Sequence, residues 1–425
     1  ITPLIHVFKF GGASVKDAEG VKNLSKIVAL NKDKQLLIVV SAMGKTTNAL
    51  EQLATAHFNR SEQVPQLFET VKTYHHHLLI NLFEDSNHPV FDQIANTFVE
   101  IDWILEDEPH PDYDFNYDQI VSIGELVSTR IVSAYLNHIG LKNQWIDARD
   151  YVHTDNTYRE GIVDWEKTCH HIQTNLIPIL KNQIAITQGF IGGTSENFTT
   201  TLGREGSDYT ASIFASCLKA ESVTIWKDVP GVLNADPKLF ENTQKYDELS
   251  YSEALEMTYY GASVIHPKTI KPLQNAHISL LVKPFLHPHE PGTTIKDIPY
   301  THDIEPAIIV KKDQVLVSLS TKDFSFITED HLSAIFGSFA HARIKINMMQ
   351  VSALSFSVCF DWDNLRFDKL NSLLQDQFKI KYNTTLELLT VRHFKRDLIK
   401  QLSSGKIILM EQFSRNTVQM VLKDI

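Results

Sequence analysis

Two stretches, HVFKFGGASV at residues 6–15 and TTTLGREGSDYTA at residues 199–211, decide the fold of this 425-residue chain. The first begins with alternating, β-prone residues, so it predicts a strand that delivers Lys9 to Gly11 and Gly12. Glycine N–H groups can line an anion because no Cβ blocks its approach, and a helix opening after them would favour the same negative charge. This stretch therefore predicts a phosphate-binding turn beside a fixed cation.

The second stretch is too polar for a core and has too few apolar residues for an ordinary strand, so it predicts a binding loop. Ile213, Phe214 and Cys217 follow at helical spacing, which would place a helix N-terminus beside the loop. Arg204 suits a planar carboxylate, because its guanidinium can bind both oxygens at once. Both stretches thus predict sites for anions.

The composition limits the classes of function. A chain of 425 residues should hold two or three domains with a large core. Its net charge of −11, from 40 basic and 51 acidic residues without a basic block, argues against nucleic acid or an anionic membrane as the principal partner. No apolar run reaches the roughly 18 residues that span a bilayer, and residues 1–3 lack a signal-peptide layout, so we expect a cytoplasmic protein.

The cysteines and histidines predict neither a disulfide framework nor a metal site. Cys169, Cys217 and Cys359 are odd in number and far apart, which predicts reduced, mostly buried thiols. Residues 75–77 are consecutive histidines in a helical stretch, where neighbours point in different directions around the axis and cannot all bind one ion. We interpret them as a solvated helix face.

Apolar runs that alternate with helical stretches predict an α/β domain with a mainly parallel sheet. Buried strands are expected at residues 36–41, 184–187, 223–226 and 278–282, helices over 48–105, a Pro- and Asp-rich bridge over 106–118 and a further strand at 120–123. We expect every motif to follow a strand, because ligands of such sheets gather at the carboxyl ends of the strands. The loop at 42–47 is not a P-loop, since Val39 stands where that pattern needs glycine.

After about residue 305 the pattern predicts a smaller unit. Thr328 can cap a helix, a second helix is expected around Leu370, and strands are expected at residues 314–320, 344–349, 354–360, 385–391 and 417–422. The order is βαββαβ-like with a partial repeat, and the second copy is short.

Seven ordered motifs resemble those of the aspartokinases, a family with the amino-acid-kinase fold. They are KFGGASV, VVSAMGKTTN, SIGELVSTR, TQGFIG, TTTLGREGSD, KDVPGVLNADP and YGASVIHP, and they cover residue 6 to about 295. The C-terminal unit resembles the paired ACT domains of this family, although a structural dimerisation unit would show the same pattern. The resemblance implies a catalytic domain over residues 1–300, ACT-like domains over 306–383 and 384–425, and a homodimer or higher homo-oligomer.

The resemblance implies an ATP-dependent kinase, acting with Mg²⁺, that makes 4-phospho-L-aspartate at the entry to lysine, methionine and threonine biosynthesis and is controlled by an amino acid. It assigns Lys9 to the transferred phosphate and Asp208 to ordering that lysine or a metal; Thr47, Glu125, Phe190, Thr201, Arg204 and Ser207 to aspartate; and Gly11, Gly12, Ser41, Lys227, Asp228, Leu233, Asp236 and Lys238 to the nucleotide. No homoserine dehydrogenase unit is expected before Ile425.

The chemistry agrees with these assignments. A side-chain carboxylate is ionised at neutral pH, so its attack on a γ-phosphate needs charge neutralisation rather than a general base. No convincing Ser-His-Asp triad is visible. Two alternatives stay open: another amino-acid kinase, such as one that uses glutamate, and a catalytically silent amino-acid-binding regulator.

Some positions depart from the family pattern. Glu205 stands where the family usually has glycine, and Ser263 where many members carry a lysine that faces the nucleotide, so Lys227 or Lys268 is an open candidate for that cation. The expected effector pocket lies between the first ACT-like helix and residues 344–349. Asn347 and Ala353 are neutral there, whereas the lysine-inhibited pattern has carboxylates. This predicts weak inhibition by lysine.

Overall fold

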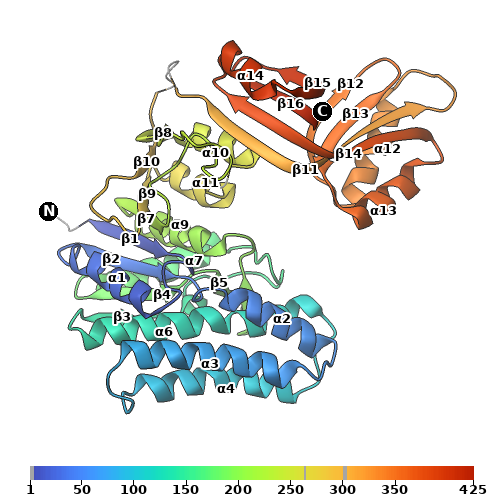
Figure 1. Ribbon diagram of the computed structural model, residues 1–425. Helices are drawn as coiled ribbons and strands as arrows, with labels where there is room; N and C mark the ends of the chain where they lie inside the picture. The colour runs from blue at the N-terminus through green and yellow to red at the C-terminus, as the bar shows by residue number, and fades with distance from the viewer. Residues whose placement is uncertain (1–3, 263–264, 300–303) are drawn as a thin grey trace. The chain divides into compact units, whose positions relative to one another are not determined.

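Two sheets organise the computed structural model, which describes residues 4–262, 265–299 and 304–425 (Figure 1). The first unit holds the described parts of residues 1–232, 245–255 and 264–299. The second holds those of 233–244, 256–263 and 300–425. Within the described residues, no helix combines the length and apolar character needed to cross a bilayer.

An eight-stranded sheet with the order β3-β4-β2-β1-β7-β9-β10-β8 is the centre of the first unit. Its strands are β1 (Ile5–Phe10), β2 (Gln35–Val40), β3 (Asn143–Trp145), β4 (Ile184–Gln188), β7 (Ser222–Lys227), β8 (Glu248–Ser250), β9 (Ser279–Pro284) and β10 (Thr293–Lys296). Every neighbouring pair is parallel except β9 with β10. β2 and β7 pair with opposite sides of β1, so the carboxyl end of β1 is a topological switch point, where such sheets bind ligands.

Helices cover both faces of this sheet. The helices before residue 276 are α1 (Ala18–Ala29), α2 (Thr46–Phe58), α3 (Val64–Leu82), α4 (Val90–Glu106), α5 (Tyr113–Val121), α6 (Ile123–His138), α7 (Trp165–His171), α8 (Ile177–Leu180), α9 (Gly206–Leu218), α10 (Tyr251–Tyr260), which is divided between the two units, and α11 (Pro267–Asn275), with a 3₁₀ helix η1 (Ala148–Asp150) and a π-helix η2 (Ile172–Leu176). Side chains of α1 to α6 share one core with Phe8, Phe10 and Ile38, while α9 contacts β1, β2 and β7. A small ribbon of β5 (Ile191–Gly193) and β6 (Thr199–Thr201) precedes α9.

The sequence predicted most of these elements. The strands expected at residues 36–41, 184–187, 223–226 and 278–282 are confirmed as β2, β4, β7 and β9, and the helical stretch as α2 to α4. The strand at 120–123 is wrong, because α5 ends and α6 begins there. Asp112 caps α5 by accepting from Asp114 N, and a four-residue apolar run fits a buried helix as well as a strand.

The cysteine and histidine predictions need correction. Cys169 of α7 and Cys217 of α9 form a disulfide, so they are not reduced thiols, whereas Cys359 is free and buried. Nothing in a spacing of 48 residues reveals such a pairing, because only the packing of α7 on α9 brings the two together. His75 is fully buried on the inner face of α3, where burial lowers its pKa to about 4, and only His76 and His77 are exposed.

The second unit contains one six-stranded antiparallel sheet with the order β12-β13-β11-β14-β16-β15. Its elements are β11 (Ala307–Thr321), α12 (Glu329–His341), β12 (Ile346–Val351), β13 (Phe356–Asp361), α13 (Asn364–Leu374), β14 (Phe378–Arg392), α14 (Arg396–Ser403), β15 (Lys406–Phe413) and β16 (Thr417–Asp424). Thr328 caps α12 as predicted, in a capping box with His331. The long strands β11 and β14 pair through both halves of the sheet. The expected boundary between the two ACT-like domains, between residues 383 and 384, falls within β14.

Candidate active site

Two backbone loops meet at the carboxyl ends of β1 and β2. Gly44 N donates to Gly12 O at 3.0 Å, and Ser41 N donates to Phe10 O at 3.1 Å. A Cβ on Gly12 would lie 2.7 Å from the carbonyl oxygen of Ala42, so the close approach of the loops requires glycine there. The predicted glycine turn is therefore confirmed as a loop lined by backbone, and its contact with phosphate stays a prediction.

A buried ion pair joins the two stretches that decided the fold. Lys9 Nζ lies 2.6 Å from Asp208 Oδ1, with 11% and 4% of the two side chains exposed. Asp208 is in the first turn of α9, where the helix dipole favours a carboxylate. A Cβ on Gly11 would lie 3.3 Å from Lys9 Nζ, so the ammonium group faces the glycine loop. The pair fixes one cation beside this loop.

Glu125 carries an unpaired carboxylate oxygen at the start of α6. Its side chain is 2% exposed, and Oε1 accepts from Ala42 N at 3.3 Å. Among the described residues, Oε2 has no hydrogen-bond partner, and burial raises the pKa of Glu125 to about 8. Buried polar atoms in native proteins almost always have a partner. A ligand's ammonium group would supply such a partner, and the contact of Glu125 with substrate stays a prediction.

The affinity for an ammonium-bearing substrate should consequently increase with pH. A carboxyl with a pKa of about 8 is mostly protonated at pH 6.5, and binding of an ammonium group requires its charged form. We expect the dissociation constant of L-aspartate to fall roughly ten- to thirtyfold between pH 6.5 and 8.5, with release of a proton on binding. Calorimetry in buffers of different ionisation enthalpy measures both quantities. Glu125→Gln should bind weakly at every pH, and a pH-independent constant in the wild type would contradict this role.

Gly189 and Phe190, just after β4, pack tightly against Gly206 and Ser207 at the start of α9. Phe190 has a left-handed backbone with φ of 72°; its N–H donates to Thr210 Oγ1 at 2.9 Å and its carbonyl accepts from Leu202 N at 2.8 Å. Such a conformation costs a bulky residue about 1–3 kcal/mol and is concentrated at functional sites. A Cβ on Gly189 would lie 2.4 Å from Ser207 Oγ, so α9 begins in tight contact with this turn.

The other predicted aspartate residues differ in accessibility. Thr201 is fully buried and its hydroxyl donates to Asp118, so its direct contact with substrate stays a prediction. Thr47 lies in the first turn of α2 and is partly exposed. Arg204 is exposed and has no ion pair within the described chain, which leaves its guanidinium available for a carboxylate. Glu205 has a left-handed backbone with φ of 54°, which explains the family's preference for glycine there.

The structure brings together only some of the residues that we assigned to nucleotide binding. The carbonyl of Lys227 accepts from Phe285 N at 2.7 Å at the end of β7, and exposed Asp228 follows. Leu233, Asp236 and Lys238 belong to the second unit, so their joint role with Lys227 stays a prediction. Ser263 lies outside the described residues. A Cβ on Gly203 would lie 3.6 Å from Lys268 Nζ, so this lysine is beside the loop of Arg204.

The carboxylate beside the glycine loop fits a magnesium ion that binds together with a nucleotide. Among the described residues, no three or more His, Cys, Asp or Glu side chains converge as a metal site. Mg²⁺ is usually held by one or two carboxylates together with substrate phosphates. The carboxylate of Asp208 beside the glycine loop meets that requirement.

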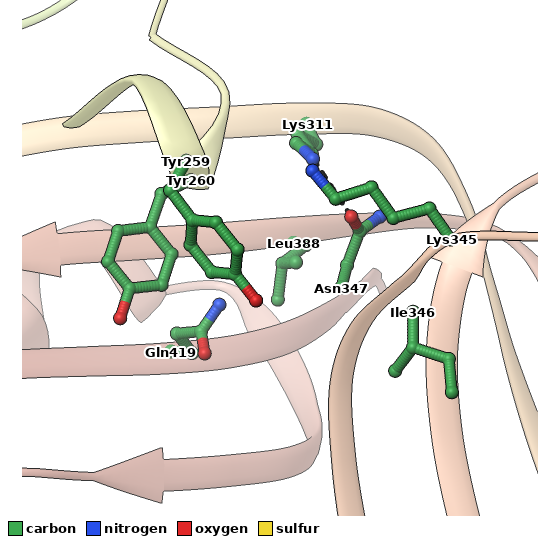
Figure 2. Close-up of a pocket in the computed structure, with 8 residues that line it drawn as sticks. All are labelled: Tyr259, Tyr260, Lys311, Lys345, Ile346, Asn347, Leu388 and Gln419. Atoms are coloured by element: carbon green, nitrogen blue, oxygen red, sulfur yellow. Dashed lines mark hydrogen bonds between the residues drawn. The ribbon is translucent and has the colours of Figure 1, made fainter. Parts of the chain in front are cut away.

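Asn347 of the expected effector pocket is fully engaged by neighbouring side chains. Its Oδ1 accepts from Lys311 Nζ at 2.9 Å (Figure 2), and its Nδ2 donates to Gln314 Oε1 and Asp361 Oδ1, each at 2.9 Å. Burial would raise the pKa of Asp361, but hydrogen bonds from Gln314 and Asn347 and two nearby lysines hold it below its usual value. A carboxylate therefore does reach this region, although the sequence positions compared above are neutral.

The space beside this network is small. Tyr259, Tyr260, Leu388 and Gln419 line it from other elements (Figure 2), together with Lys345, whose ammonium lies 5.1 Å from the ring centre of Tyr259. The cavity measures about 10 Å³, which is room for a single water molecule. This cavity is therefore too small for an amino acid.

Motif reading missed one residue that contacts the binding loop. Asp118 is fully buried on α5 and binds Thr201. The sequence offered little signal, because Asp118 stands between Tyr117 and Gln119 in the Pro- and Asp-rich stretch that predicts a bridge.

Comparisons with known proteins agree with this geometry. The sequence profile of the amino acid kinase family matches residues 5–284. Lysine-sensitive aspartokinase 3 of Escherichia coli is 30% identical over 84% of this chain and 78% of its own length. The structure of E. coli aspartokinase III with lysine and aspartate in the T-state has a TM-score of 0.82 at 26% identity, covering 98% of this chain and 95% of that one. The R-state structure with aspartate and ADP has a TM-score of 0.80 at 26% identity, covering 98% and 96%.

Proposed function

Since this chain belongs to the amino acid kinase family and, within it, to the aspartokinases, we propose that it transfers the γ-phosphoryl group of ATP to the side-chain carboxylate of L-aspartate. A carboxylate oxygen forms the new bond to phosphorus, the bond to the leaving phosphate oxygen breaks, and ADP departs. The product, 4-phospho-L-aspartate, would enter lysine, methionine and threonine biosynthesis. The observation that carries the proposal is the Lys9–Asp208 ion pair beside the glycine loop.

Several described residues support this proposal. Two anions must approach, so the site must offer positive charge and oriented N–H groups more than a base. Lys9 provides a buried cation next to the glycine loop, and Asp208 holds it in place. Mg²⁺, when bound with ATP through Asp208, would neutralise phosphate charge. Glu125 and Arg204 would bind the ammonium and α-carboxylate groups of aspartate, and a simple dicarboxylic acid lacks the ammonium group that Glu125 would bind.

Trapping the acyl phosphate with hydroxylamine tests the proposal against both alternatives. We expect hydroxamate to form with ATP and L-aspartate, and little with L-glutamate. Hydroxamate from glutamate alone would indicate the other amino-acid kinase. Its absence with both substrates, while either amino acid still binds, would indicate a silent regulator.

We further propose that an amino acid regulates the enzyme through the second unit, with lysine as a weak effector. Lys311 and Lys345 already outnumber the carboxylate of Asp361 around Asn347. Lysine would add two ammonium groups to this region, and burying a charge without a partner costs several kcal/mol. Threonine, or no amino acid at all, is the better candidate effector.

Initial rates at subsaturating aspartate test this proposal. With lysine and threonine each titrated into the millimolar range, we expect little inhibition by lysine. Asn347→Asp adds a carboxylate beside Lys311 and should increase the sensitivity to lysine, which makes it the matched variant. Strong inhibition of the wild type by micromolar lysine alone would contradict the proposal.

A further inference from the structure

We propose that Asp118 is a positioning residue that anchors the Thr201–Arg204 loop of the aspartate pocket from behind. Its Oδ2 accepts from Thr201 N at 2.9 Å and from Arg159 N at 2.8 Å, and its Oδ1 accepts from Thr201 Oγ1 at 2.7 Å. One side chain of α5 thus ties together two segments that lie 41 and 83 residues away in the sequence. The proposal rests on the aspartate kinase function.

The chemistry of the three partners explains why a carboxylate occupies this position. Two backbone N–H groups and a hydroxyl all donate, and an ionised carboxylate is a side chain that only accepts. Asp118 is fully buried, and burial raises its pKa to about 6 although all three donors oppose the shift. A buried carboxylate is costly unless it is well bonded. Its position is therefore better explained by the geometry that it imposes than by stability.

The anchored segments connect directly to the candidate substrate residues. Gly161 N donates to Thr201 O at 2.9 Å, so the turn after Arg159 and the end of β6 are bonded to each other as well as to Asp118. Arg159 has a left-handed backbone with φ of 67°, a conformation that needs such support. Leu202, the next residue after Thr201, donates to the carbonyl of Phe190. Without Asp118, Thr201 would lose two hydrogen bonds that hold the backbone leading to Arg204 in place.

The test compares the Michaelis constants of the two substrates. We expect Asp118→Ala to lower kcat/KM for aspartate at least tenfold, while KM for ATP stays within twofold. Asp118→Asn should retain activity within about threefold, because its carbonyl can accept from both N–H groups and its amide can donate to the threonine oxygen. Equal losses for both substrates, no loss, or an Asn variant as impaired as the Ala variant would each overturn the proposal.

Asn116→Ala is the matched control. Asn116 lies on the same helix, is 3% exposed and bonds to backbone atoms of His110 and Asp112 instead of Thr201. Its loss should lower thermal stability without a selective effect on aspartate. If Asp118→Ala does not fold, Asp118→Leu replaces it, because leucine has a similar volume and no acceptor, and the same selective loss for aspartate is expected.

Hydrogen exchange separates this proposal from the proposed function. Peptides that contain the amides of residues 159 and 201 should exchange faster in Asp118→Ala than in the wild type or Asn116→Ala, whatever reaction the enzyme catalyses. Absence of hydroxamate with the wild type would refute the kinase assignment alone. Unchanged exchange at both amides would overturn the anchor.

Discussion

Replacing Lys9 with alanine is expected to reduce turnover about a hundredfold or more, because it removes the buried cation beside the glycine loop. The charge that develops on the transferred phosphoryl group would lose its fixed counter-charge. Steady-state rates at saturating ATP and aspartate measure the loss. Lys26→Ala, at an exposed position of α1, is the control and should leave the rate unchanged.

This variant needs a second control, because it leaves Asp208 without its partner. Breaking a buried ion pair costs about 3–5 kcal/mol, so thermal stability should fall as well. The double variant Lys9→Met with Asp208→Asn removes both charges and should recover most of the stability. We expect it to remain inactive. Turnover within threefold of the wild type in Lys9→Ala, or recovery of activity with stability in the double variant, would refute a catalytic role for the charge.

Substituting Arg204 with lysine is expected to weaken aspartate binding about ten- to a hundredfold while the affinity for ATP changes little. Lysine keeps the charge but cannot form the two parallel hydrogen bonds that guanidinium offers to a carboxylate, and hydrogen bonds to charged groups contribute about 1.5–3 kcal/mol. Arg204 is exposed, so stability should not change. Equilibrium titrations of each substrate measure the two affinities.

Arg60→Lys is the matched control for this substitution. Arg60 is also exposed, and its guanidinium pairs with Glu108 instead of facing the binding loop. Neither affinity should change in this variant. Unaltered aspartate binding in Arg204→Lys would exclude Arg204 as the carboxylate ligand and would leave Lys268, beside Gly203, as the nearer candidate.

The candidate site divides into residues that local patterns predicted and residues that they could not. Lys9, Gly12 and Asp208 stand in short motifs whose chemistry is local: a strand end, a close backbone approach and a helix N-terminus. Asp118 was missed because its role depends on a partner 83 residues away. His75 was misread because three adjacent histidines resemble a polar face, although a helix turns one of them into the core.

The elements of the second unit were also only partly predictable from the sequence. The order from β11 to β14 and the last strand β16 were predicted, since each of these elements has its own period and Thr328 marks the start of α12, whereas α14 and β15 were missed. That β11 and β14 would each extend over 15 residues and join both halves in one sheet could not be predicted. Register between strands is set by cross-strand packing and by bulges such as that near Gln314, which have no local signature.

By itself, the sequence determined the α/β core, the two binding stretches and the family. Hydrophobic periodicity, glycine positions and charges are local features, and each can be recognised within a few consecutive residues. Only the tertiary structure decided which distant groups meet: the Lys9–Asp208 pair, the Cys169–Cys217 disulfide and the network of Asn347 with Lys311. Each of these contacts closes a loop of tens to hundreds of residues. Its energy depends on packing that the whole chain creates, so no short segment encodes it.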